Sequence, residues 1–246
     1  MSLVLKTAPT VEPLSLLEVK DHLRLDPDDN TEDALLNAFI TAARQDCEAF
    51  QGRAYITQTW ELWLDAFPGE AFIRLDKPPL QSRTITAGAF VVGKEYRILS
   101  IGTTDFTLIG AASNTVGVHF TATGVGSGTG TATDGPFIKY YDTDDTEATF
   151  AASNYFVDTK SEPGRVALNY SAAWPSTTLR PVNGVCVIFV AGYGDAAANV
   201  PQYIKSAILL LIGHWYENRE GAAIPSAIPK EIPFGVEALL WKERVF

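Results

Sequence analysis

The sequence predicts an α+β fold, in which a helical bundle core is combined with a β-strand region and an inserted small all-β module. Three observations indicate this class. Apolar residues recur at helical spacing near both ends of the chain. Between these helices they alternate with a period of two, which is typical of half-buried strands. Within the strand region, residues 86–136 change to a composition rich in Gly, Thr, Val and Ala.

Two helices are predicted near the start of the chain. The first spans about residues 15–23, where Ser15 is followed three residues later by Glu18 in the pattern of a capping box. The second spans about residues 31–51 and carries one apolar stripe. It ends before Gly52, a residue suited to the left-handed position that follows a helix.

The middle of the chain is predicted to form strands. Alternation is clearest in the first of them, and Pro78 and Pro79 end the second. Gly192 follows the last strand and closes it. The strands are expected at about residues 57–64, 72–75, 137–141, 155–158, 165–168 and 185–191.

The last third of the chain is predicted to contain a helix over about residues 201–219 and a C-terminal arm, residues 221–246. The helix begins near Pro201 and is apolar on more than one side. The arm contains three prolines and then a short apolar helix. We therefore expect the chain to complete its burial against neighbouring copies or partners. The candidate interface residues are Ile208, Leu211, Trp215, Tyr216, Arg219, Val236, Leu239, Leu240, Trp241 and Phe246.

The domain organisation follows from the change in composition. Both flanks of residues 86–136 resemble strands of one host domain, so we interpret this stretch as an insertion into a loop. The host domain is then residues 1–85 plus 137–246. The insertion is expected to be peripheral, on the outside of any assembly that the chain forms.

Composition limits the possible partners. The 246-residue chain has a net charge of −10, and gripping nucleic-acid phosphates requires clustered Lys and Arg. An acidic wall can still surround DNA without binding it, because it repels phosphate. The N-terminus lacks the apolar region of a signal peptide, and the apolar run 207–213 is too short to span a bilayer. We expect a protein kept in the cytosol or in something assembled there, without membrane contact.

No motif predicts catalysis, a cofactor or a metal. Glycines at every second position from Gly124 to Gly130 differ from a dinucleotide loop, and no helix follows them. The acidic run 26–32 fails the calcium-loop pattern, so we interpret it as helix capping. Cys47 and Cys186 are expected to be buried apolar side chains. The remaining enzyme alternative is a site assembled around His22 or His214 with nearby carboxylates.

Several segments together resemble the head-tail connector (adaptor) proteins of long-tailed double-stranded DNA bacteriophages and related prophages. The resemblance covers most of residues 12–85 and 137–246. The insertion at about residues 86–136 is where the sequence departs from the family. The number and order of the segments make it specific. They are residues 14–25, 42–44, 52–62, 77–80, 161–166, 191–194, 214–220 and 236–241.

This resemblance implies a non-enzymatic virion part at the head-tail junction, assembled in the host cytoplasm. Such adaptors form a ring, usually dodecameric, beneath the portal protein and extend the DNA channel. They also present a platform for the stopper or tail-completion protein, and DNA passes through without specific binding. A tail terminator, or another neck or tail-completion protein, is the alternative within virion structure.

Overall fold

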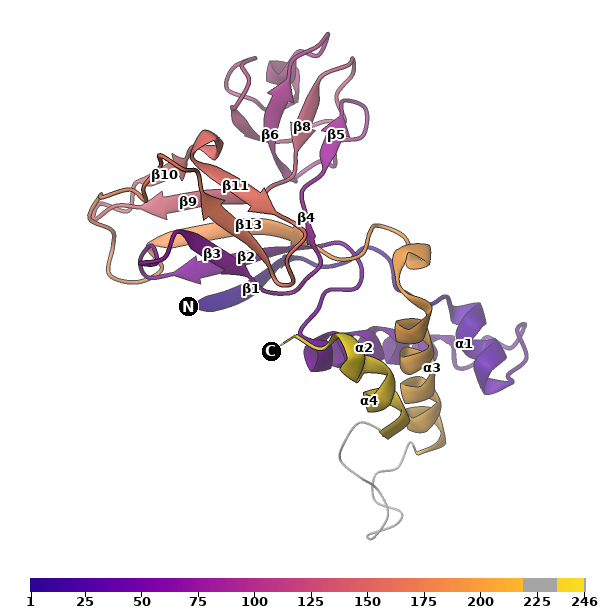
Figure 1. Cartoon of the computed structure of the whole chain (residues 1–246). Coiled ribbons are helices and arrows are strands. Elements are labelled where there is room, and N and C mark those ends of the chain that lie inside the picture. The colour runs from indigo at the N-terminus through magenta and orange to yellow at the C-terminus, as the bar shows by residue number, and fades with distance from the viewer. Residues whose placement is uncertain (219–233, 246) are drawn as a thin grey trace. The chain divides into compact units, whose positions relative to one another are not determined.

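The computed structural model describes residues 1–218 and 234–245, and it divides into two compact units. The β unit comprises Met1–Thr7, Thr59–Leu75 and Leu80–Val190. The helical unit comprises Ala8–Gln58, Asp76–Pro79 and Ala191–Phe246. The elements of the two units are drawn in Figure 1. Helices and antiparallel sheets are both present, so the predicted α+β class is confirmed.

The helical unit contains α1 (Leu16–Leu23), α2 (Asp33–Gln51), α3 (Gln202–Glu217) and α4 (Phe234–Leu240). The capping box of α1 is present, because Ser15 Oγ accepts from Glu18 N at 3.2 Å and Glu18 Oε2 accepts from Ser15 N at 2.7 Å. Gly52 ends α2 with a φ of 69°, the left-handed conformation expected of it.

The predicted helix at about residues 31–51 starts two residues before α2. The helix begins at Asp33, because Asp29 and Asn30 hold the preceding residues in turns. Asp29 Oδ1 accepts from Thr31 N at 3.0 Å, and Asn30 O accepts from Asp33 N at 3.4 Å. The side-chain bond of Asp29 in particular competes with the helix for a backbone donor.

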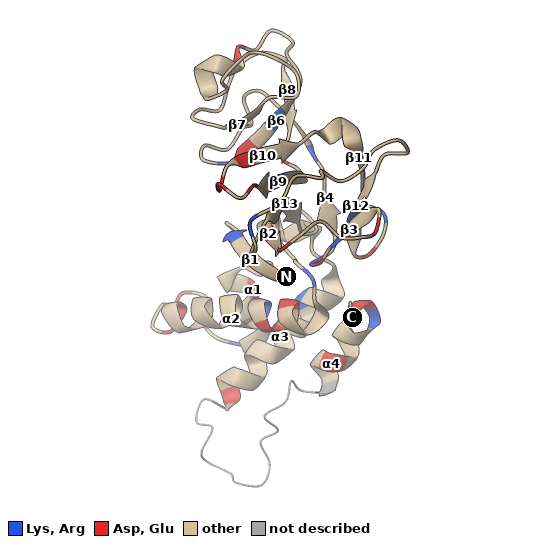
Figure 2. Cartoon of the chain, turned by 90° about the vertical axis from the view of Figure 1, so that its left-hand side faces the viewer, with Lys and Arg blue, Asp and Glu red and all other residues tan. Residues whose placement is uncertain are grey.

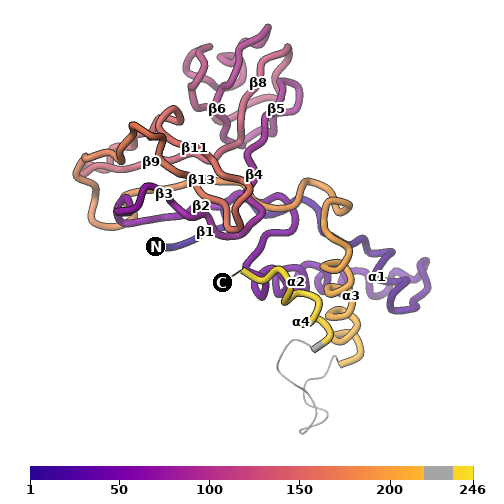
Figure 3. Tube along the Cα trace, in the orientation of Figure 1, coloured from indigo at the N-terminus to yellow at the C-terminus, as the bar shows by residue number. Residues whose placement is uncertain are grey.

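One apolar core joins all four helices. It includes Leu36 and Ile40 of α2, Ile208 of α3, and Val236 and Leu240 of α4, each at most 2% exposed. The C-terminal segment, yellow in Figure 3, returns to the side of α2 from the far end of the sequence. We expected the C-terminal arm to be buried against a partner. Residues 236 and 240 of the arm are instead buried by their own chain. The arm's residues 221–233 and 246 lie outside the described residues.

The β unit is built on a six-stranded sheet with the order β1-β2-β13-β9-β10, in which β4 also pairs with β13. Its strands are β1 (Ser2–Thr7), β2 (Gln58–Leu64), β4 (Leu80–Gln81), β9 (Phe137–Tyr141), β10 (Glu147–Phe150) and β13 (Val185–Ala191). All seven residues of β13 are buried. This continuous apolar strand therefore lies at the centre of the sheet.

A second sheet has three strands in the order β11-β12-β3. They are β3 (Phe72–Leu75), β11 (Tyr155–Asp158) and β12 (Gly164–Leu168). All six strands predicted from the sequence are found in these two sheets. The edge strands β1 and β10 and the two-residue β4 were not predicted. β1 is exposed on both faces, and β4 is too short to show an alternation.

A third sheet lies within residues 84–133 and has the order β5-β8-β6-β7. Its strands are β5 (Thr84–Thr86), β6 (Glu95–Ser100), β7 (His119–Thr121) and β8 (Thr131–Thr133). Its own aromatic core contains Phe90, Tyr96, Phe106 and Phe120, with ring centroids 4.9–5.9 Å apart. The division of the chain into a host domain and an inserted module at 86–136 stays a proposal, which this separate core supports.

The burial of Leu240 predicts that the C-terminal helix stabilises the fold. Replacing Leu240 by Ala should lower the free energy of unfolding by about 2–5 kcal/mol, the range for removing a buried leucine side chain. Urea unfolding followed by circular dichroism at the helical wavelength reports on this, because the α-helices lie in the helical unit. Lys242→Ala, an exposed neighbour, is the control and should be neutral. Equal stability of the Leu240→Ala and Lys242→Ala proteins would contradict the structural role of α4.

Candidate assembly interface

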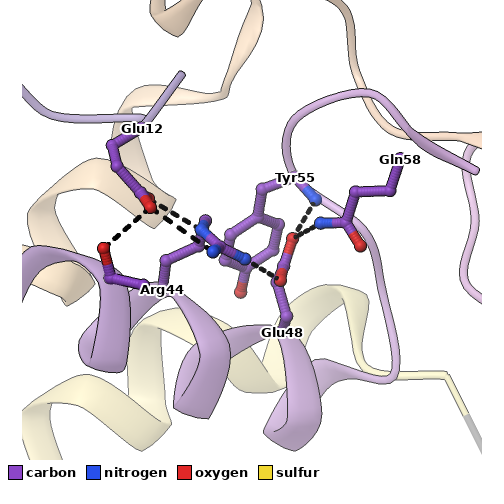
Figure 4. A network of polar contacts seen from close by, with 6 residues as sticks. Glu12, Arg44, Glu48, Tyr55 and Gln58 are labelled. Carbon is purple, nitrogen blue, oxygen red and sulfur yellow. Dashed lines mark hydrogen bonds and ion pairs between the residues drawn. The ribbon is translucent and has the colours of Figure 1, made fainter. Parts of the chain in front are cut away.

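A buried polar network fixes the chain around α2. The Arg44 guanidinium contacts two carboxylates, with Nε 2.7 Å from Glu12 Oε2 and Nη1 2.7 Å from Glu48 Oε2. Glu48 Oε1 also accepts from Tyr55 N at 2.7 Å and from Gln58 Nε2 at 2.6 Å. Figure 4 shows these side chains converging from the segment before α1, from α2 itself and from the segment after it.

The charges in this network depend on one another. Burial opposes the charge of Arg44, but its contacts with Glu12 and Glu48 raise the pKa of the guanidinium. Burial raises the pKa of the Glu48 carboxyl, although hydrogen bonds from Arg44, Tyr55 and Gln58 favour its ionised form. Without Arg44, Glu48 would be a buried carboxylate with no cation, so we interpret the network as structural.

A second set of polar contacts attaches the C-terminal segment to the end of α2. Gln51 Nε2 donates to Leu240 O at 2.7 Å, and Arg53 Nε donates to Glu243 O at 2.5 Å. Glu243 Oε2 accepts from the hydroxyls of Tyr193, at 3.2 Å, and Tyr203. These contacts fix the position of the residues that follow α4.

The fixed segment presents an aromatic and basic surface, which we call the Trp241 patch and define as Phe50, Trp241 and Arg244. Trp241 is 58% exposed, and its ring lies 6.4 Å from that of Phe50. Arg244 Cζ lies 4.5 Å from the centre of the Phe50 ring and 5.2 Å from that of Trp241. Tryptophan and arginine are enriched among residues that dominate binding energy, so the patch is a candidate partner surface.

The structure places the ten predicted interface residues in three different environments. Ile208, Leu211, Val236 and Leu240 belong to the core of the helical unit. Three others are partly buried and pack against that core, namely Trp215, Tyr216 and Leu239. Trp241 is exposed, and Arg219 and Phe246 lie outside the described residues.

The partly buried aromatics of α3 have partners in their own chain. Trp215 lies edge-on to Phe39 of α2, with ring centroids 5.9 Å apart. The hydroxyl of Tyr216 donates to Glu32 Oε2 at 2.6 Å. A role for these residues in contacts between chains stays a proposal.

Exposed leucines elsewhere on the helices extend the candidate surface. Leu210 of α3 is 44% exposed, and Leu17 of α1 is 55% exposed. Neither residue is among the ten interface residues predicted from the sequence. Helical spacing could have identified Leu210 as an exposed apolar residue, because it lies on the face of α3 opposite Ile204, Ile208 and Leu211.

The sheet at residues 84–133 carries little charge. Its charged residues are Lys94, Glu95, Arg97 and Asp105, whose charges cancel. Figure 2 shows how few coloured segments it contains. Two ion-pair clusters connect it to the rest of the β unit. In one, the buried Asp134 Oδ2 lies 2.8 Å from Arg83 Nη2 and 3.1 Å from Lys94 Nζ. In the other, Glu95 Oε1 of β6 lies 3.0 Å from Lys139 Nζ of β9.

The histidines proposed for the enzyme alternative lie in the helical unit. His22 packs closely against α3 at Gly213, where an added Cβ would lie 3.3 Å from His22 Nε2. His214 Nδ1 lies 3.4 Å from Asn218 Nδ2. Among residues 1–218 and 234–245, no group of three or more His, Cys, Asp or Glu side chains could hold a metal ion. None of the helices in the described part of the chain has the length and apolar character required to cross a bilayer.

Comparison with known proteins identifies a matching family. Residues 13–98 match the family described as phage gp6-like head-tail connector proteins. No individually curated protein sequence matches the chain significantly.

Solved structures match over the whole chain. One is described as the neck of an empty GTA particle computed with C6 symmetry, with a TM-score of 0.66, 21% identity, and coverage of 100% of this chain and 96% of the other. A second comes from the virion of a native gene transfer agent (GTA) particle, with a TM-score of 0.64 and the same identity and coverage. A third is the neck of a native GTA particle computed with C12 symmetry, with a TM-score of 0.62 and again the same identity and coverage.

These matches confirm the resemblance predicted from the sequence. The matched family is described as head-tail connector proteins, and the similar structures are described as parts of GTA particles, which agrees with the expectation of a structural protein. At 21% identity the solved structures establish the fold, and they include residues 86–136 in the alignment because they cover all of this chain.

The buried network makes a prediction about charge pairing. Replacing Arg44 by Met should lower the free energy of unfolding by about 3–5 kcal/mol, because Glu48 then loses its cation in a buried site. The double variant Arg44→Met/Glu48→Met should be more stable than Arg44→Met alone, since it removes the unpaired carboxylate. Urea unfolding of both variants at neutral pH measures the difference. A double variant no more stable than Arg44→Met would show that Arg44 acts by packing instead.

Proposed function

Since this chain is similar to the phage gp6-like head-tail connector proteins over residues 13–98, we propose that it is a structural protein of the neck of a phage-like particle. There it assembles as a homo-oligomeric ring, a dodecamer, beneath the portal protein. The ring extends the DNA channel and joins the DNA-filled head to the tail. The family match is the observation that carries this proposal.

The ring is supported by the symmetry of the similar structures. These necks are described with sixfold and twelvefold symmetry, which suits a protein that is repeated around an axis. Copies in such a ring need two different surfaces that fit each other. The exposed Leu17 and Leu210 are candidates for this contact, because their burial between copies would remove apolar area from water.

The acidic balance supports a channel for DNA. The net charge of −10 means that a wall formed by many copies repels phosphate and allows DNA to slide without specific binding. The sheet at residues 84–133 contributes nothing to this charge. We propose that it lies at the periphery of the ring.

The Trp241 patch is our candidate for the contact with the portal protein. It combines an exposed tryptophan with a stacked arginine on a segment that is held in place by Gln51 and Arg53. Preorganised aromatic anchors bind at a low entropic cost, which suits a contact made once during particle assembly. A stopper or tail-completion protein would then bind a different face of the ring.

A tail terminator, or another neck or tail-completion protein, is the second candidate function. It shares the ring and the location near the neck but not the contact with the portal protein. Binding to the portal protein therefore separates the two.

Native mass measurement tests the proposal. The purified chain, mixed with the portal protein from the same genome, should form a complex with one copy per portal subunit. The chain alone serves as the control, because a ring of this kind can depend on the portal for its assembly. No complex at any salt concentration would contradict the adaptor function and favour the tail-side alternative.

The Trp241 patch gives a site-specific prediction. Trp241→Ala should weaken binding to the portal protein by roughly tenfold or more, the effect expected for an aromatic anchor. Its effect on the unfolding of the isolated chain should be small, because the indole is mostly exposed. Tyr170→Ala, which alters a fully exposed aromatic residue of the β unit, is the matched control. Equal portal binding by the two variants would exclude the patch from this contact.

A further inference from the structure

A pocket of about 360 Å³ lies within the β unit, beside the edge strand β10. Arg97 of β6 and His119 of β7 line it, and these two residues are direct cross-strand partners. Thr149 of β10 and Ser153, just after β10, line the other side. The remaining wall consists of small residues, so a side chain can enter.

Two buried nitrogens at this pocket have no hydrogen-bond partner in the described part of the chain. Nε of Arg97 and Nδ1 of His119 are buried, and neither makes a hydrogen bond within residues 1–218 and 234–245. The closest acid to His119 is Glu95, whose Oε1 is 3.7 Å from Nδ1. That oxygen is already 3.0 Å from Lys139 Nζ. Buried donors without acceptors are rare in native proteins, and each one calls for an explanation.

The unsatisfied Nε–H of Arg97 requires an acceptor, and the charge of that acceptor can be inferred. Arg97 makes no ion pair with any carboxylate in the described part of the chain. By contrast, Arg44, Arg83, Arg165 and Arg180 each contact an Asp or Glu. A guanidinium offers a planar set of donors that matches a carboxylate with two parallel hydrogen bonds. The site is therefore built for a carboxylate that this copy does not supply.

We propose that the Arg97–His119 pocket receives an acidic side chain from a neighbouring copy of this chain. The argument for a second copy is charge complementarity. Each copy carries ten more carboxylates than cations, so its neighbour always presents acids while unpaired arginines are scarce. The inference rests on the proposed ring, and it adds to the contacts on the helices one contact between copies at the edge of the peripheral sheet, where Arg97 and His119 lie beside β10.

An uncharged variant of Arg97 distinguishes a role in the contact between copies from a role in the stability of a single copy. Arg97→Met keeps the length of the side chain and removes the charge. The isolated protein should unfold at the same temperature or higher, because the buried Nε of Arg97, which has no acceptor, has been removed. Ring assembly with the portal protein should weaken by about tenfold or more, the equivalent of about 1.4 kcal/mol. Lys160→Met, which makes the same charge change at an exposed site, should alter neither property.

A second variant identifies the acid. The Arg97→Lys protein keeps the charge and supplies an amine that a carbodiimide can couple to a carboxylate in contact with it. Rings assembled from a mixture of ¹⁴N- and ¹⁵N-labelled copies should give peptides in which residue 97 of one copy is joined to an Asp or Glu of the other. Links confined to a single copy would overturn the proposal.

Inorganic phosphate is the probe for the other source of negative charge. If phosphate raises the unfolding temperature of the original protein but not of Arg97→Met, and both assemble equally well, the pocket holds a free oxyanion and the contact between copies is refuted. A ring that forms equally well with Arg97→Met, while that variant unfolds at a lower temperature, gives Arg97 a structural role and leaves the adaptor function intact. If the original protein forms no ring at all, the inference and the proposed function fail together.

Discussion

The pairing of Arg44 with Glu12 and Glu48 is the interaction on which the helical unit depends. It joins three segments that the sequence separates: the extended residues before α1, the middle of α2, and the residues that lead into β2. Such a pair contributes more to defining one conformation than to net stability, because burying two charges costs nearly as much as their attraction returns. Removing only one partner of the pair lowers the stability of the fold, because it leaves the other charge buried without a counterion. The network therefore fixes how the chain leaves α2, and with it the site at which the C-terminal segment can pack.

The C-terminal segment contributes to both the core and the surface within a few residues. Val236 and Leu240 complete the apolar core, whereas Trp241 on the same segment is exposed and lies against the half-buried Arg244. Hydrogen bonds from Gln51 and Arg53 hold the backbone at this transition. The aromatic side chains are thus ordered before any partner arrives, which lowers the entropic cost of binding. A contact surface supported in this way is consistent with a protein whose function is to be built into a larger structure.

Much of the fold could be predicted from local pattern. The capping box at Ser15, the glycine after α2 and the alternation in β2 each follow from the chemistry of a few adjacent residues. The candidate interface was harder to predict, because an apolar residue at helical spacing has the same signature whether it is buried by its own chain or by another. Ile208 and Leu240 were selected as interface residues on that signature, and they lie in the core. Arg97 had no local signature, since its lack of a partner depends on where every carboxylate of the β unit lies.

The sequence by itself determined the α+β class, the positions of the main helices and strands, and the resemblance to head-tail connector proteins, because these depend on periodicity, turn chemistry and motif order. Only the tertiary structure decided which apolar residues are core, how α4 packs on α2 and α3, and which charged groups are paired. The physical reason is that burial and ion pairing are properties of residues distant in sequence. The partners Gln51 and Leu240 are 189 positions apart, and no local pattern connects them.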